Sequence, residues 1–214
     1  MKTIRNSFLL LFICTISAYS QQNDFQNWSS LKITKKIYKR TNFSLKQGIR
    51  FRENASLISK NFTDVKLSHR LKKTDFGVSF GYRLSTDFDL DISYDNKHRF
   101  YIDFTSKYDY KRFKTSFRER VQYQGNIISD YSALFRTKID ISYNVRKTPF
   151  EPFLQFESFM TMKDKFEKFR YTIGFSHPIF KDLNADFFYR IQQNFNTNNP
   201  ERIFILGSSL RYKL

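Results

Sequence analysis

The sequence predicts an all-β fold, a single antiparallel transmembrane β-barrel of about 10–12 strands of the outer-membrane type. Three observations predict it. Apolar and polar side chains alternate with period two through most of the chain after residue 25. Most of the alternating segments reach the roughly nine to eleven residues of a tilted membrane strand, and short turns alternate with longer loops between them. The chain has 26 Phe and 13 Tyr although its mean hydropathy is −0.56, and a barrel wall with one apolar face accounts for this mixture.

The first twenty residues have the features of a signal peptide. A basic start is followed by an apolar stretch over residues 8–16, which is too short to span a bilayer, and Ala18 and Ser20 supply small residues for a signal peptidase. We expect cleavage before Gln21, which would leave residues 21–214 as one barrel domain exported to the bacterial outer membrane. The only cysteine, Cys14, lies within the peptide, so we expect no disulfide and no thiolate metal site in the mature chain.

The predicted mature chain is strongly basic. Its formal charge falls from +17 to +15, because the peptide removes Lys2 and Arg5 and no acidic residue. The cations are scattered at strand period, without a basic run or a recognition helix, so nucleic acid is not an expected partner. We expect instead membrane lipids, including anionic lipopolysaccharide headgroups, and small anionic solutes as partners.

The clearest predicted strand covers residues 76–84. Its apolar face has Val78 and Phe80 among its residues, and its other face has Ser79, Gly81 and Arg83. Eleven segments alternate in this way, with the first interrupted by a lysine on its apolar face: 27–37, 41–52, 62–71, 76–84, 99–108, 113–124, 135–145, 150–160, 169–176, 183–192 and 202–214.

Eleven segments conflict with the even strand number of bacterial single-chain barrels, whose two ends lie in the periplasm. Ten strands result if the weak segment 27–37 lies outside the wall. Twelve result if the aspartate-rich connection after residue 84 hides another strand, and we prefer twelve. The short turns near residues 39, 73, 111, 147 and 180 are predicted to be periplasmic.

The polar face of the predicted strands is basic and should face the lumen. We expect Glu53, Asp64, Asp103, Glu157 and Asp186 to balance only part of this charge. The protein would then be a non-enzymatic structural barrel, filled by its own side chains, or a narrow anion-preferring channel. The residues predicted to line the lumen are Arg50, Arg52, Arg83, Arg99, Arg118, Arg120, Arg136, Glu157, Arg170 and Arg190.

An outer-leaflet lipid-modifying enzyme, of the phospholipase or lipid A deacylase type, is the alternative function. Such a site needs a histidine beside a hydroxyl nucleophile near one membrane interface. His69, His98 and His177 are the candidates, and His98 has Ser93 nearby in sequence. No further feature supports catalysis, so we expect no catalytic residue and no cofactor.

Four aspartates in the connection after residue 84 raise the question of a calcium site. The connection lacks the glycine and the terminal glutamate of the helix-loop-helix calcium motif. A solvated loop without a metal is therefore the expectation for Asp87, Asp89, Asp91 and Asp95.

Several short motifs, in their order and spacing, resemble the domain-of-unknown-function 2490 family of bacterial outer-membrane proteins, common in Bacteroidetes. The resemblance covers nearly all of the mature chain and implies an outer-membrane barrel without an established activity. The terminal amphipathic strand is also typical of such barrels and implies the barrel-assembly machinery as a partner. The motifs are Trp28, Arg50-x-Arg52, Gly81-Tyr82-Arg83, His98-Arg99-Phe100, Arg118-x-Arg120-x-Gln122, Pro152-x-Leu154-x-x-Glu157 and Arg170-Tyr171-x-x-Gly174.

Overall fold

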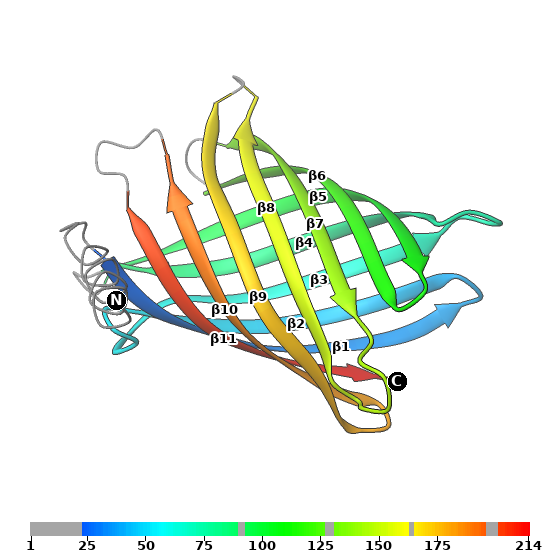
Figure 1. Cartoon of the computed structure of the whole chain (residues 1–214). Coiled ribbons are helices and arrows are strands. Elements are labelled where there is room, and N and C mark those ends of the chain that lie inside the picture. The colour runs from blue at the N-terminus through cyan, green and yellow to red at the C-terminus, as the bar shows by residue number, and fades with distance from the viewer. Residues whose placement is uncertain (1–22, 90–92, 127–130, 163–164, 196–200) are drawn as a thin grey trace, which may run out of the picture.

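The described part of the protein is a closed all-β barrel, as the alternation predicted (Figure 1). The computed structural model describes residues 23–89, 93–126, 131–162, 165–195 and 201–214, so the predicted signal peptide lies outside the described residues. The strands in these residues are β1 (Asn23–Tyr38), β2 (Thr41–Arg52), β3 (Leu57–Arg70), β4 (Phe76–Phe88), β5 (Tyr94–Tyr110), β6 (Phe113–Asn126), β7 (Ser132–Tyr143), β8 (Glu151–Thr161), β9 (Phe166–Phe180), β10 (Leu183–Asn194) and β11 (Arg202–Lys213).

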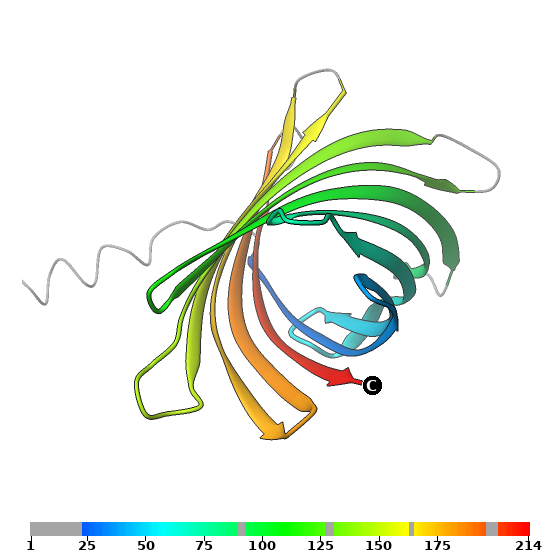
Figure 2. The same cartoon turned by 90° about the vertical axis from the view of Figure 1, so that its right-hand side faces the viewer.

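The barrel closes between β1 and β11, which run parallel because the eleven described strands are odd in number (Figure 2). Their register runs from Asn23 opposite Arg202 to Thr34 opposite Lys213. Eleven lies within the predicted range of 10–12, but the expectation of an even number is wrong. The weak segment 27–37 belongs to a full wall strand, because backbone pairing with β2 and β11 does not require perfect side-chain alternation.

The aspartate-rich connection contains no additional strand among its described residues. Instead, β4 extends to Phe88 and β5 begins at Tyr94, so that Asp87 and Asp95 face each other as a cross-strand pair. Asp91 lies outside the described residues. The sequence pattern missed this extension because aspartate has a low strand propensity, whereas the pairing of the two strands continues past the alternating core.

The two ends of the barrel differ in their connections. Short turns join β1–β2, β3–β4, β5–β6, β7–β8 and β9–β10, near the five predicted positions, and β11 finishes at the same end, which we call the turn end. The opposite, loop end has the other connections and the beginning of β1. The first residue of β1 and the last residue of β11 therefore lie at opposite ends of the barrel (Figure 1). The expectation that both lie on one side of the membrane is wrong.

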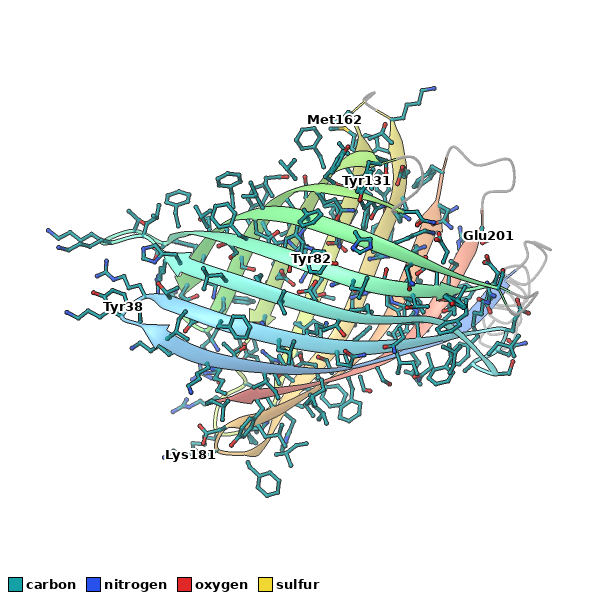
Figure 3. The ribbon with its side chains drawn as sticks, turned by 180° about the vertical axis from the view of Figure 1, so that it is seen from behind. Tyr38, Tyr82, Tyr131, Met162, Lys181 and Glu201 are labelled. Carbon is teal, nitrogen blue, oxygen red and sulfur yellow. The ribbon has the colours of Figure 1, made fainter. Side chains whose placement is uncertain are left out.

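The side chains separate into an outer apolar face and an interior face. Phe80 is 58% exposed on the outside, whereas the adjacent Ser79 is 4% exposed in the interior. Tyrosines gather near both ends of the outer face, with Tyr38 at the turn end and Tyr131 at the loop end (Figure 3), as in the aromatic girdles of membrane barrels. Among the described residues, no helix is long and apolar enough to cross a membrane.

Candidate functional site

Two cavities lie in the barrel interior, one of about 360 Å³ toward the turn end and one of about 200 Å³ toward the loop end. Arg52 lines neither, because it lies at the loop end, where its Nη2 donates to the Phe88 carbonyl at 2.7 Å. The other predicted lumen residues line one cavity or both. Arg50, Arg83, Arg136 and Arg170 line both, Arg118, Arg120, Glu157 and Arg190 line only the larger, and Arg99 lines only the smaller.

Positive charge dominates the walls of both cavities. Twelve lysines and arginines line the larger cavity and four more line only the smaller, which makes sixteen. The acidic residues number three and two, which makes five. The four arginines that line both cavities lie between them and narrow the interior to a basic constriction.

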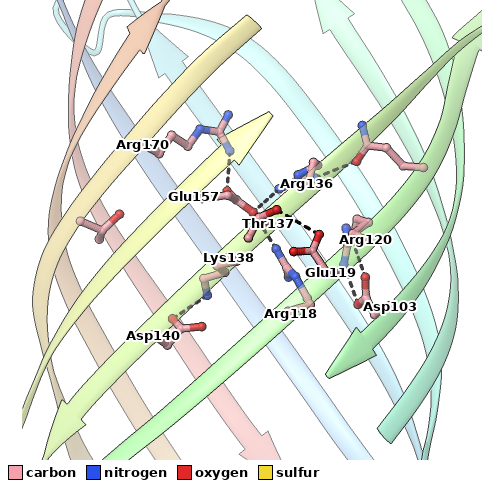
Figure 4. A network of polar contacts seen from close by, with 12 residues as sticks. Asp103, Arg118, Glu119, Arg120, Arg136, Thr137, Lys138, Asp140, Glu157 and Arg170 are labelled. Atoms are coloured by element: carbon pink, nitrogen blue, oxygen red, sulfur yellow. Dashed lines mark hydrogen bonds and ion pairs between the residues drawn. The ribbon is translucent and has the colours of Figure 1, made fainter. Parts of the chain in front are cut away.

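Glu157 on β8 is the centre of the largest interior ion-pair cluster (Figure 4). Its Oε1 accepts hydrogen bonds from Arg118 at 2.6 Å and from Arg136 at 2.8 Å, and its Oε2 accepts one from Arg170 at 3.4 Å. The three arginines come from β6, β7 and β9, because the period-two alternation turns one side chain of each neighbouring strand inward at this level. One carboxylate therefore forms ion pairs with three guanidinium groups.

A second cluster joins β3 to β6. Arg120 binds both oxygens of Asp103, at 2.6 and 2.9 Å, while Arg83 and the Tyr101 hydroxyl donate to Asp64 at 2.8 and 2.7 Å. Tyr101 lies across Gly81, where an added Cβ would come within 2.1 Å of the ring. Glycine at position 81 is therefore what lets the tyrosine hydroxyl reach Asp64.

Three of the cavity-lining arginines have only neutral partners among the described residues. The Arg50 guanidinium stacks on Trp28, with 3.7 Å between its Cζ and the ring centroid. Arg99 Nε donates to the Gln124 amide at 2.9 Å, and Arg190 Nε donates to the Thr172 hydroxyl at 2.8 Å. No described carboxylate lies within ion-pair distance of these three, so they form an uncompensated part of the wall, which we call the unpaired arginines.

Some interior guanidinium nitrogens also lack a hydrogen-bond acceptor within the described protein. They are the Nε atoms of Arg50, Arg52, Arg118, Arg136 and Arg211, each with almost no solvent-accessible surface. Buried N–H donors without an acceptor are unfavourable, so each of these donors costs the folded barrel some stability.

Apolar side chains fill part of the interior, which the sequence analysis largely missed. Trp28, Ile203 and Ile205 pack together with Phe188, and Phe62 is also buried beside the arginines. Phe62 and Phe188 follow the parity of their basic neighbours on β3 and β10, so strand parity already placed them inward. The interior is thus narrower than its polar residues alone suggest.

The aspartates near the loop end are paired with lysines. Asp87 forms ion pairs with Lys60 and Lys97, the latter at 3.1 Å, and Asp95 lies 3.6 Å from Lys97. No group of three or more metal-binding side chains occurs among the described residues. These two aspartates therefore belong to ion pairs of the wall rather than to the solvated loop that the sequence analysis expected.

The histidines do not form the arrangement that a lipid hydrolase would need. His98 accepts from or donates to the Tyr82 hydroxyl at 2.7 Å on the outer wall, and His69 lies 2.9 Å from the Thr41 hydroxyl at the turn end. His177 is exposed near the turn end. None has a serine and a carboxylate arranged beside it within the described residues, which does not favour the enzyme alternative.

One carboxylate that the sequence analysis did not consider has the parity of the outer face. Glu119 alternates with the inward Arg118 and Arg120 on β6, and its Oε2 accepts a hydrogen bond from Thr137 at 3.0 Å. Its position between Phe117 and Val121 was visible in the sequence as a polar residue at an apolar place. A hydrogen bond from a neighbouring strand reduces the unfavourable free energy of a polar group there.

The comparisons with known proteins agree with this architecture. No curated protein matches the sequence. The NanC porin structure matches with a TM-score of 0.52 and 11% identity over 85% of this chain and 93% of that chain, which shows a porin-like barrel fold. The KdgM porin matches with a TM-score of 0.49 and 13% identity over 79% of this chain and 88% of that chain. A family model described as protein of unknown function (DUF2490) matches residues 25–203, so the chain belongs to the DUF2490 family, as its motifs indicated.

Proposed function

We propose that the protein is a narrow, anion-preferring channel of the bacterial outer membrane. The observation that carries this proposal is the set of unpaired arginines, Arg50, Arg99 and Arg190, in the walls of two interior cavities. Rings of cationic side chains favour anions and repel cations in a pore. A basic constriction with too few carboxylates therefore attracts the anions that it lets pass.

The unpaired arginines lie on different sides of the interior. Arg50 is on β2, Arg99 on β5 and Arg190 on β10, so their charges surround the axis. The paired arginines at Glu157, Asp103 and Asp64 lie on β4, β6, β7 and β9 and stiffen the wall between them. In this proposal the paired arginines stabilise the barrel wall, and the unpaired arginines contact the anion.

Planar-bilayer recording under a salt gradient tests the proposal. The reversal potential should have the sign of anion selectivity. The double variant Arg99→Gln and Arg190→Gln, which removes two of these positive charges, should be less selective. These two arginines are the suitable targets, because neutralising Arg118 or Arg120 would leave Glu157 or Asp103 without a main partner. A cation-selective reversal potential would refute the basic-channel reading.

A control outside the interior cavities is Arg70→Gln, which removes one positive charge, whereas the double variant removes two. Arg70 is exposed at the turn end and binds Asp75 at 2.9 Å, away from the interior cavities. It should leave the reversal potential unchanged. A folded, inserted protein that passes no current would favour a filled structural barrel, consistent with the apolar side chains around Trp28.

A further inference from the structure

Three arginines from three strands surround the indole ring of Trp28. The Cζ atoms of Arg50, Arg170 and Arg190 lie 3.7, 5.1 and 5.4 Å from the centroid of this ring. They belong to β2, β9 and β10, and all three side chains line the cavity of about 360 Å³. No other aromatic ring among the described residues has more than two guanidinium groups beside it.

Neighbouring contacts hold the indole ring in this position. Arg50 lies directly opposite Trp28 in the register of β1 and β2. The indole Nε1 donates a hydrogen bond to Gln26 Oε1 at 2.9 Å, and Ile203 and Ile205 of β11 pack against the buried ring. The three arginines therefore surround a ring whose place in the wall is fixed.

The guanidinium groups keep hydrogen-bond donors that a ligand can use. Arg50 stacks on aromatic rings, and its Nε has no acceptor among the described residues. Arg190 donates from its Nε to the Thr172 hydroxyl at 2.8 Å. A guanidinium group has five N–H donors, and stacking on a ring leaves the donors along its edge free. Arg50 and Arg190 therefore present N–H groups to the cavity.

The acids of this cavity leave the charge beside the indole positive. Glu157 accepts a hydrogen bond from Arg170 at 3.4 Å, but two other arginines bind the same carboxylate at 2.6 and 2.8 Å. Asp64 and Asp186 form ion pairs with arginines that do not contact the indole. Most of the positive charge around Trp28 is therefore uncompensated by the described protein.

We propose that Arg50, Arg170 and Arg190 bind an oxyanion, a carboxylate or a phosphate, beside Trp28. The inference rests on the proposed function and names the ligand class of its basic interior. A planar guanidinium group holds two oxygens of one carboxylate or phosphate through parallel hydrogen bonds, and a halide has no second oxygen to hold. The site should therefore bind oxyanions more tightly than chloride.

Trp28 reports on the site directly, because it is the only tryptophan of the chain. Its fluorescence is measured on the exported protein in micelles of a neutral detergent. Sodium phosphate, sodium acetate and sodium chloride are titrated separately and compared at equal ionic strength. Phosphate, acetate or both should change the emission saturably, at a severalfold lower concentration than chloride does. A response to only one of the two identifies that oxyanion as the ligand, whereas equal responses to all three salts would overturn the proposal.

Two double variants separate the shape of the guanidinium groups from their charge. Arg50→Gln with Arg190→Gln should lose the saturable response. Arg50→Lys with Arg190→Lys keeps both charges without the planar donors, so it should respond to oxyanions and chloride alike. It provides the same test if the glutamine variant does not fold, which heat-modifiable gel migration shows. A lysine variant that keeps the oxyanion preference would overturn the proposal.

The matched control is Lys60→Gln with Lys168→Gln. It also removes two positive charges, from side chains that line only the smaller cavity and do not contact Trp28. It should keep the oxyanion preference. An equal loss in the control and in the glutamine variant of Arg50 and Arg190 would mean that the total charge of the interior, and not the indole site, binds the anion.

Planar-bilayer recording of the same protein separates this inference from the proposed function. An oxyanion preference in the fluorescence of a protein that passes no current would refute the channel and leave the site. An anion-selective current without an oxyanion preference in the fluorescence would overturn the site and leave the channel.

Discussion

Replacing Glu157 by glutamine should destabilise the barrel more than any other single Glu→Gln or Asp→Asn substitution. Glu157 is the carboxylate shared by Arg118, Arg136 and Arg170, at 2.6, 2.8 and 3.4 Å. Glu157→Gln keeps an oxygen that can accept one hydrogen bond, but it removes the negative charge. Three guanidinium groups would then face one another without an acid between them.

The magnitude follows from the burial of the four side chains. Glu157 and Arg136 are each 9% exposed, Arg170 is 11% exposed and Arg118 is 20% exposed. Removing one partner of a buried ion pair costs about 3–5 kcal/mol. Arg136 and Arg170 keep hydrogen bonds to Gln122 and Gln192, so we take the lower end, about 3 kcal/mol. With a urea dependence of about 2 kcal/mol per molar, the unfolding midpoint should fall by about 1.5 M.

Urea unfolding of the protein in lipid vesicles, followed by heat-modifiable gel migration, measures this loss. The matched control is Glu151→Gln, which breaks an ion pair with Lys114 whose side chains are 31% and 50% exposed. An exposed pair contributes less than about 1 kcal/mol, so the control should shift the midpoint by less than about 0.5 M. Equal shifts in the two variants would show that water or ions screen the Glu157 cluster, and the reasoning would fail.

Two further predictions test the wall itself. Phe80→Arg, on the outer face, should prevent stable insertion, because an outward arginine costs about 2–4 kcal/mol near the membrane midplane. The control Gln155→Arg, on the wall of the larger cavity, should insert. Equal flotation of the two variants with vesicles would contradict the assignment of the faces. Cysteines replacing Ser30 and Ser209, whose hydroxyl oxygens lie 3.1 Å apart across β1 and β11, should form a disulfide, while cysteines at positions 30 and 211 should not. The reverse pattern on a non-reducing gel would refute the parallel closure.

The barrel fold and the inward or outward direction of each side chain were predictable, because both follow from the alternation of apolar and polar residues with period two. The separation of Phe80 from Ser79 in the structure is the same separation that the alternation predicts. Ion-pair partners were less predictable, since parity places Arg118, Arg136 and Glu157 on one face without giving their heights. The position of each side chain along the barrel axis depends on the register between neighbouring strands. Turns and bulges set this register, and the sequence of one strand alone does not reveal it.

The closure of the barrel was not predictable from the same pattern. Strand parity is a local property, whereas the pairing of β1 with β11 joins residues at the two ends of the chain, such as Trp28 and Gly207. An even strand number was assumed from other barrels rather than from these residues. Similarly, Asp87 and Asp95 interrupted the apolar pattern, although the backbone pairing continues through both.

The unpaired arginines connect the proposed conduction to stability. Arg50, Arg99 and Arg190 meet only an aromatic ring, an amide and a hydroxyl, so the folded barrel concentrates positive charge that the unfolded chain spreads out. An anion that binds there stabilises the folded state by RT ln(1 + [L]/Kd). The unfolding midpoint should therefore rise with chloride more than with a bulky anion of equal ionic strength that cannot enter cavities of about 360 and 200 Å³.

The double variant Arg99→Gln and Arg190→Gln should weaken this chloride dependence, because it removes two of the three unpaired arginines and leaves only Arg50. General screening by salt would instead act equally with either anion and in both proteins. An identical response to chloride and to the bulky anion in the unaltered protein would mean that no anion enters the constriction. The same unpaired charges would then be compensated by water alone, and the arginine constriction would close the barrel rather than select what passes through it.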